Sequence, residues 1–278
     1  MAEKKRFEDA KTPEELIEAL ESRALARHNT GSGGVKKYVC HYTKMSAISA
    51  ILKSKKWYIG SPKTMNDGLE LIHLEDAHVD NLFFASFCLD DSENIGMWSM
   101  YAQPWEDGVL LRIPVEKFKT WMKSGCKIFD ADKKTKTTGT EIKGANLSFH
   151  AVAYTNSESK DTKETEVLTC GNAQNSHFSN SPETPELKGY IKDSAWAYEN
   201  EYRIRVETVP NEKHDAVAID IPTDVLDSFE YITGPRFDKN FIAVLRNTVG
   251  AKLNPKLKES LFTGRLKWIY CDSCHQRV

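Results

Sequence analysis

Two glutamates lie two residues apart in the run Trp196-Ala197-Tyr198-Glu199-Asn200-Glu201-Tyr202-Arg203, between aromatic residues and at the start of a strand-like segment. Alternate side chains of a strand point to the same face, so we expect Glu199 and Glu201 to project together. Two carboxylates on one side are costly unless a cation or a hydroxyl-rich ligand lies opposite them. The pair therefore indicates a ligand-binding active site.

A second segment with reactive side chains lies far upstream, in the β-type run Tyr38-Val39-Cys40-His41-Tyr42-Thr43. It combines the imidazole of His41 with three hydroxyl groups, a set suited to the ribose and phosphate groups of a nucleotide. A single histidine is more often partly buried and bonded to nearby backbone. The segment alone leaves both interpretations open.

Two aromatic residues three positions apart, Trp98 and Tyr101, share one face of a short helix expected over Gly96–Tyr101. Aromatic residues at this spacing more often belong to the core than to a ligand clamp. The hydroxyl gives Tyr101 a polar tip, however, so its ring could lie against a flat ring such as nicotinamide.

Other motifs carry less information. Asn66-Asp67-Gly68 is typical of a turn, in which Asp67 could cap a helix while Glu70 faces a pocket. The run Cys271-Asp272-Ser273-Cys274-His275 has the spacing of a haem attachment motif or of half a zinc site, but no second Cys or His pair completes it. We therefore expect no metal, and an unliganded tail over residues 271–278.

The composition is that of an ordinary soluble protein, with 278 residues, 40% hydrophobic and 28% charged. A net charge of -2 gives no global attraction to nucleic acid, and no apolar run approaches the roughly 20 residues needed to cross a bilayer. Basic residues near the start are not followed by an apolar segment, which argues against a signal peptide. We expect a cytoplasmic protein without a membrane partner, and six free thiols.

The pattern of elements predicts a single α+β domain over residues 35–270 with a twisted, mainly antiparallel or mixed sheet. A capped helix begins at Thr12-Pro13-Glu14-Glu15 and forms an appendage over residues 1–30, ahead of Gly31-Ser32-Gly33-Gly34. Polar stretches over residues 131–143 and 155–186 are expected to be long loops or lids. The expected strands include Asn81–Cys88, Tyr202–Val206, Ala216–Ile221 and Leu266–Tyr270, and the expected helices include Met45–Leu52, Val115–Lys123 and Asn240–Val249.

These blocks together resemble a bacterial family of domains of unknown function. The resemblance rests on His41-Tyr42-Thr43, Trp98-Ser99-Met100-Tyr101, the run from Trp196 to Arg203, and Ile232-Thr233-Gly234-Pro235-Arg236. The chain departs from the family pattern at Gly68, where proline is usual, and at Tyr202, where tryptophan is usual. Neither departure removes a group with an expected catalytic role.

More remotely, that family is similar to the ADP-ribosyltransferase superfamily, whose members place a histidine, a tyrosine or serine, and a glutamate on the strands of a split sheet. The resemblance implies that the domain binds NAD as a substrate through its split, mainly antiparallel sheet with flanking helices. His41, with Tyr42, Thr43, Trp98 and Arg203, would bind the dinucleotide. Tyr101 would stack on the nicotinamide, Glu201 would be the catalytic carboxylate, and Glu199 would help to activate the acceptor.

The leading hypothesis is therefore an NAD-dependent mono-ADP-ribosyltransferase that modifies nucleic acid (RNA or DNA) or protein. Small cytoplasmic bacterial transferases of this kind often act as toxins or phage-defence effectors, so an antitoxin protein is a candidate partner. Two alternatives stay open: an NAD glycohydrolase that transfers the ribosyl group to water, and a non-catalytic module that senses a nucleotide. For Arg203, a structural ion pair with Glu201 and a contact with phosphate are equally compatible with the sequence.

Overall fold

The computed structural model of the chain describes residues 12–25, 36–65, 79–132, 134–156, 166–167, 189–210, 212–249 and 257–265. These residues form an α+β fold with six α-helices and a large, mostly antiparallel mixed sheet, which confirms the predicted fold class. The helices are α1 (Pro13–Leu25), α2 (Met45–Ser54), α4 (Ile95–Tyr101), α5 (Val115–Lys123), α6 (Thr223–Leu226) and α7 (Lys239–Val249). Two 3-10 helices, η2 (Pro62–Thr64) and η5 (Ser194–Glu199), complete the helical elements of the described residues.

Three antiparallel strands form the spine of the large sheet: β3 (Leu82–Leu89), β11 (Glu201–Glu207) and β7 (Asn146–Ala151). Strand β3 is almost continuously buried, because Leu82, Phe83, Phe84 and Phe87 supply apolar side chains on both faces. The apolar run had predicted a buried strand over residues 81–88, and the structure confirms it. Strand β11 pairs with β3 along its whole length, from Glu201 opposite Cys88 to Glu207 opposite Leu82.

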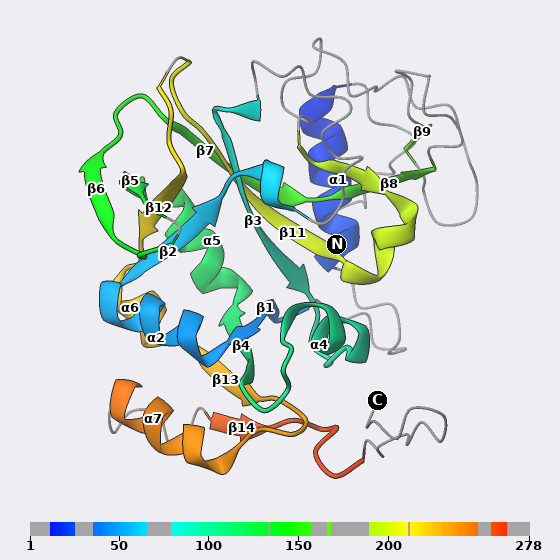
Figure 1. Cartoon of the computed structure of the whole chain (residues 1–278). Helices are drawn as coiled ribbons and strands as arrows, with labels where there is room; N and C mark the ends of the chain where they lie inside the picture. Colours follow the sequence, from blue (N-terminus) through cyan, green and yellow to red (C-terminus); the bar gives the residue numbers. More distant parts are fainter. Residues whose placement is uncertain are drawn as a thin grey trace, which may run out of the picture.

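Two wings join the other edge of β3 (Figure 1). The first wing contains β1 (Tyr38–Lys44), β4 (Gly108–Pro114), β13 (Glu230–Thr233) and β14 (Leu257–Glu259). The second contains β2 (Lys56–Gly60), β12 (Ala216–Asp220), β5 (Ile128–Ala131) and β6 (Thr138–Glu141). Because a strand has only two edges and β11 occupies one, β1 and β2 must share the other.

The two wings meet β3 at different places and leave a fork between them. Strand β1 pairs with β3 only at Val39 opposite Leu89 and Cys40 opposite Cys88, whereas β2 pairs with it at Gly60 opposite Phe84. Between these joints neither wing continues the ladder along β3. Helix α2 links β1 to β2 and therefore lies beside the fork (Figure 1).

The main core packs against the spine and both wings. Helix α5 is amphipathic, and its buried side chains Phe118 and Trp121 form edge contacts with Phe87 and Trp57. Aromatic pairs of this kind contribute about 0.5–1.5 kcal/mol beyond the apolar area that they bury. Helix α5 therefore packs against β3 and β2, two of the strands that border the fork.

The N-terminal helix packs on the body. The backbone amide of Glu15 donates to the Thr12 hydroxyl at 3.3 Å, as expected for an N-cap, and α1 contacts β7. The hydroxyl of Tyr202 also donates to Glu21, which ties α1 to the spine. None of the described helices is long and apolar enough to span a bilayer.

One polar insertion differs from its prediction. Residues 131–143 were expected to be a loop, but they contain β6, which pairs with β5 to form a hairpin. All four residues of β6 are exposed, so the segment has no apolar alternation that could have indicated a strand.

The second insertion contributes to a small separate sheet of β10 (Ile191–Asp193), β8 (Ala153–Asn156) and β9 (Glu166–Val167). The rest of that insertion lies outside the described residues, as do the predicted glycine-rich separator, the Asn66-Asp67-Gly68 turn, the strand over residues 266–270, and the tail.

Candidate active site

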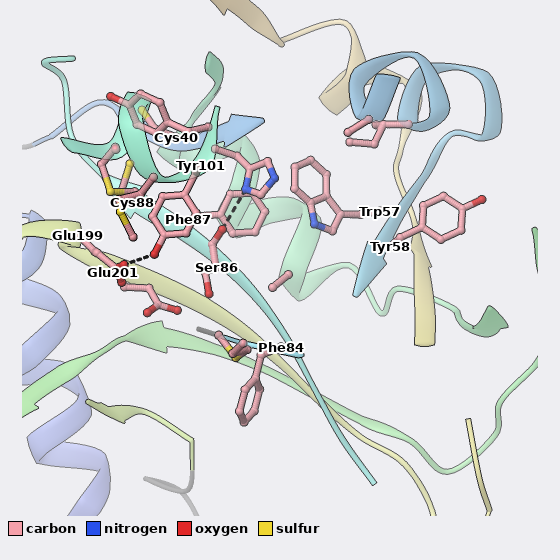
Figure 2. Close-up of a pocket in the computed structure, with 18 of the residues that line it drawn as sticks. Cys40, Trp57, Tyr58, Phe84, Ser86, Phe87, Cys88, Tyr101, Glu199 and Glu201 are labelled. Atoms are coloured by element: carbon pink, nitrogen blue, oxygen red, sulfur yellow. Dashed lines mark hydrogen bonds between the residues drawn. The ribbon is translucent and has the colours of Figure 1, made fainter. Parts of the chain in front are cut away.

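A cavity of about 500 Å³ occupies the fork between the two wings. Its floor is the part of β3 that neither wing pairs, with Ala85, Ser86 and Phe87 among its lining residues. Strands β1 and β2 and helices α2 and α4 supply most of its other walls. Figure 2 shows Glu199, Glu201 and Tyr101 at one end of the cavity and Trp57 and Tyr58 at the other.

His41 lies on β1 where that strand leaves β3, and it lines the cavity. Its Nδ1 lies 3.0 Å from the carbonyl oxygen of Ser86, so in the neutral ring Nδ1–H donates and Nε2 carries the lone pair. Burial lowers the pKa of His41, and the hydrogen bond to the Ser86 carbonyl raises it by less. The lowered pKa keeps the ring neutral. Both interpretations of this histidine therefore hold: it is bonded to backbone and it faces the cavity.

The two glutamates reach the cavity by a route that differs from the prediction. Glu199 is not on a strand with Glu201 but ends η5, and Asn200 adopts a left-handed conformation (φ 45°) between them. The side chains converge on a lysine from β10: Lys192 Nζ lies 2.7 Å from Glu199 Oε2 and 3.5 Å from Glu201 Oε2. A cation or a hydroxyl-rich ligand opposite the acid pair was expected on physical grounds, but the sequence did not identify Lys192.

A second cation holds Glu201 in place. Arg203 donates from Nε to Glu201 Oε1 at 2.6 Å and from Nη2 to Glu201 Oε2 at 2.9 Å, the paired geometry that carboxylates and guanidinium groups favour. Its Nη1 donates to the carbonyl of Gly189 at 2.6 Å. Burial raises the pKa of Glu201, but the charges of Arg203 and Lys192 outweigh burial and lower that pKa below its ordinary value, so the carboxylate is ionised.

Tyr101 lies at the acid end of the cavity, where its hydroxyl donates to Glu199 Oε1. Helix α4 presents this residue because Asn94 caps it, accepting bonds from the backbone amides of Gly96 and Met97. The amide group of Asn94 also donates to the backbone carbonyl of Tyr198 in η5. Tyr101 thus belongs to the acid cluster through its hydroxyl group. The sequence had instead indicated that its ring would stack on nicotinamide.

Of the other residues expected to bind the dinucleotide, one lines the cavity and three do not. Tyr42 lines the cavity, and its hydroxyl accepts a hydrogen bond from the backbone amide of Asn94 at 2.8 Å. Trp98, Thr43 and Arg203 are buried but are not among the lining residues. The expectation that these three touch a cofactor therefore has no support: Trp98 packs edge-on against Tyr42 in a small core cluster, and the guanidinium of Arg203 is turned to Glu201.

The far end of the cavity contains residues that the sequence reasoning did not select. Trp57 contacts His41 edge-on at a ring distance of 5.0 Å, and Tyr58 follows it on β2. The hydroxyl of Tyr58 donates to the carbonyl of Lys136 in the β5–β6 hairpin, and Lys136 Nζ lies 5.2 Å from the centre of the Tyr58 ring. This end therefore offers aromatic faces and one positive charge.

No group of three or more potential metal ligands gathers anywhere in the described part of the chain. The cavity instead combines the ionised carboxylate of Glu201, a neutral imidazole and aromatic walls. This arrangement can bind a ligand with flat rings, and at its acid end the two carboxylates are paired with two cations, Lys192 and Arg203.

Comparison with known proteins gives one match. Residues 97–204 match a family model described as "Protein of unknown function (DUF2971)". The matched segment begins in α4 and ends in β11, so it includes Tyr101, Lys192, Glu199 and Glu201 but not His41. Searches of curated proteins and of solved structures found no match.

Proposed function

We propose that the protein is an NAD-dependent mono-ADP-ribosyltransferase that cleaves the nicotinamide–ribose bond and passes ADP-ribose to an acceptor. The observation that carries the proposal is the shared cavity. The ionised Glu201 and the neutral His41 come from distant segments and line one hollow in the fork of a divided sheet. The mostly antiparallel sheet, with a cavity between its two wings, supports this proposal.

Glu201 has the charge that this chemistry needs. Loss of nicotinamide leaves an oxocarbenium-like ribose, similar to that of glycoside hydrolysis. A fixed carboxylate stabilises this cation more than it stabilises the ground state, and one such contact contributes about 3–4 kcal/mol, or roughly a hundredfold or more in rate. The low pKa of Glu201 suits this electrostatic role and not that of a proton donor.

The other lining residues would have distinct tasks. His41 would orient a ribose hydroxyl through its unprotonated Nε2, since Nδ1–H is committed to Ser86. The aromatic end at Trp57 and Tyr58 would hold a ring of the dinucleotide, and Lys136 would balance phosphate charge. Glu199 would act on the acceptor, with Tyr101 fixing its orientation.

The acceptor is proposed to be RNA, DNA or protein in the cytoplasm. The biological role inferred from the resemblance is that of a toxin or anti-phage effector, controlled by an antitoxin protein. Growth arrest on expression, together with mass spectrometry of cellular RNA, DNA and protein for added ADP-ribose, tests the acceptor and the role at once.

One observation favours a second candidate, a non-catalytic module that binds a nucleotide. Every carboxylate oxygen of the acid pair already has a protein partner: Tyr101 and Lys192 for Glu199, and Arg203 and Lys192 for Glu201. A catalytic carboxylate would have to exchange one of these contacts for the ribose.

The deciding experiment uses purified full-length protein and labelled NAD. We expect nicotinamide release together with label on an acceptor, and we expect Glu201→Gln to lower turnover by roughly a hundredfold while NAD still binds. Glu207→Gln is the matched control, because this residue ends the same strand and does not line the cavity. Melting curves verify that each variant is folded.

The outcomes separate the candidates. Nicotinamide release without any acceptor would identify a glycohydrolase. Binding without turnover in the wild type would identify the module. If NAD neither raises the melting temperature nor is consumed, the proposal is wrong.

A further inference from the structure

Two cysteines face each other where β1 of the first wing pairs with β3, at one end of the fork. Cys40 on β1 and Cys88 on β3 are directly opposed in the antiparallel register. Opposed residues in such a pair have Cα atoms about 4.5–5.5 Å apart, and disulfides span Cα distances of about 4.4–6.8 Å. The general spacing of paired strands is therefore compatible with a bond between the two sulfur atoms.

The two thiols already interact. Cys40 Sγ donates to the carbonyl of Asp90 at 3.0 Å, and the Cys88 thiol forms a hydrogen bond with Cys40. That hydrogen bond, followed by burial, raises the pKa of Cys88. The pair is held as neighbouring free thiols.

The pair also lies inside the candidate site. Both cysteines line the cavity, and Figure 2 shows them at the end that contains Glu199 and Glu201. Cys88 is opposed on its other side by Glu201, so Cys40, Cys88 and Glu201 form one row across three strands with their side chains on one face. Cys126, by contrast, is not among the lining residues and donates to the carbonyl of Trp121.

We propose that Cys40 and Cys88 are a redox-active dithiol that is oxidised to an intramolecular disulfide by a small organic disulfide entering the cavity. One cysteine thiolate attacks the reagent, forms a mixed disulfide and releases one reagent thiol. The second cysteine displaces the other half as a second thiol. The two cysteines lose two electrons and two protons, and the reagent disulfide gains them. This inference does not depend on NAD.

The product would join β1 to β3 by a covalent bond at the root of the first wing, one residue before His41 and one strand away from Glu201. Oxidation would therefore fix β1 relative to β3 at the end of the fork where the acid cluster lies. In the mixed disulfide formed on the way, one half of the small organic disulfide would occupy the cavity.

The test treats native full-length protein with hydroxyethyl disulfide at mildly alkaline pH, blocks the remaining thiols by alkylation, and maps peptides by mass spectrometry without reduction. We expect a linked Cys40–Cys88 peptide pair, the loss of both thiols from alkylation, and their return after dithiothreitol. Cys126 should give at most a mixed disulfide with the reagent.

Two controls make the result specific. Cys40→Ser should abolish the linked peptide and leave Cys88 either free or as the mixed disulfide. The wild-type chain treated while unfolded should show no preference for this pair. If native protein keeps Cys40 and Cys88 as free thiols while other cysteines react, or links them no more often than the unfolded chain does, the dithiol proposal is wrong.

Discussion

Replacement of Lys192 by methionine is the sharpest test of how the acid pair is held. The Lys192 side chain is 2% exposed, and those of Glu199 and Glu201 are 4% and 1% exposed. Methionine keeps the length of the side chain and removes its charge, so Glu199 would keep only its bond from Tyr101. Breaking a buried ion pair from one side costs about 3–5 kcal/mol.

This loss is large compared with the stability of a typical domain, about 5–15 kcal/mol. For a chain of this size it corresponds to a fall in melting temperature of roughly 10 °C. The assay is denaturant unfolding of the wild type, Lys192→Met, Glu199→Gln and the double variant. Because the double variant removes both charges of the closer pair, we expect it to be more stable than the sum of the single effects predicts, by about 1–3 kcal/mol.

Lys119→Met provides a control, because its pair with Glu21 is about one quarter exposed and should contribute about 1 kcal/mol or less. A Lys192→Met protein that unfolds at the same denaturant concentration as the wild type would refute the reasoning. So would strictly additive effects in the double variant, since they would mean that Lys192 and Glu199 do not interact.

Three further predictions follow from the structure. Burial, and to a lesser extent Arg205, lowers the pKa of His150 to about 4, so the unfolded state takes up a proton first as the pH falls below about 6.5. The wild type should therefore lose about 3 kcal/mol more than His150→Gln between neutral pH and pH values near 4, measured by urea unfolding. The same dependence of the unfolding free energy on pH in both proteins would contradict this. Gly189→Ala should be about 2–3 kcal/mol more destabilising than Gly125→Ala, because both have positive φ but only at Gly189 would the new Cβ meet Phe84, at 2.3 Å; equal denaturation midpoints would show that the ring moves aside. Saturating NAD should slow disulfide formation by the cavity dithiol, and an unchanged rate would count against nucleotide binding at the acid end.

The sequence was sufficient for the parts of the fold with a strong apolar signal. Strand β3 could be predicted because its aromatic and aliphatic residues are nearly continuous, and α5 because Phe118 and Trp121 lie on one helical face. The exposed strand β6 could not be predicted, since a strand without buried residues has no hydrophobic period to detect.

The candidate site was predictable in part. His41, Glu199, Glu201 and Tyr101 do line one cavity, as the sequence blocks indicated. The turn before β11 was missed because the alternating pattern continues backwards through Glu199, although Asp193 caps η5 by accepting from the Ala195 amide.

Lys192 had no motif that could reveal it. Its role depends on the folded structure, in which β10 brings its ammonium group close to both carboxylates. Only the argument that two carboxylates on one side need a cation or a hydroxyl-rich ligand opposite them pointed to such a residue, and that argument gives no position in the chain.

The joint between the second wing and the spine is a single paired position, Gly60 opposite Phe84, while the ladders within each wing are several residues long. Amide protons inside a wing should therefore exchange with solvent only when that wing opens as a unit. Amides beside the joint should exchange earlier, through a hinge-like opening that leaves both wings intact.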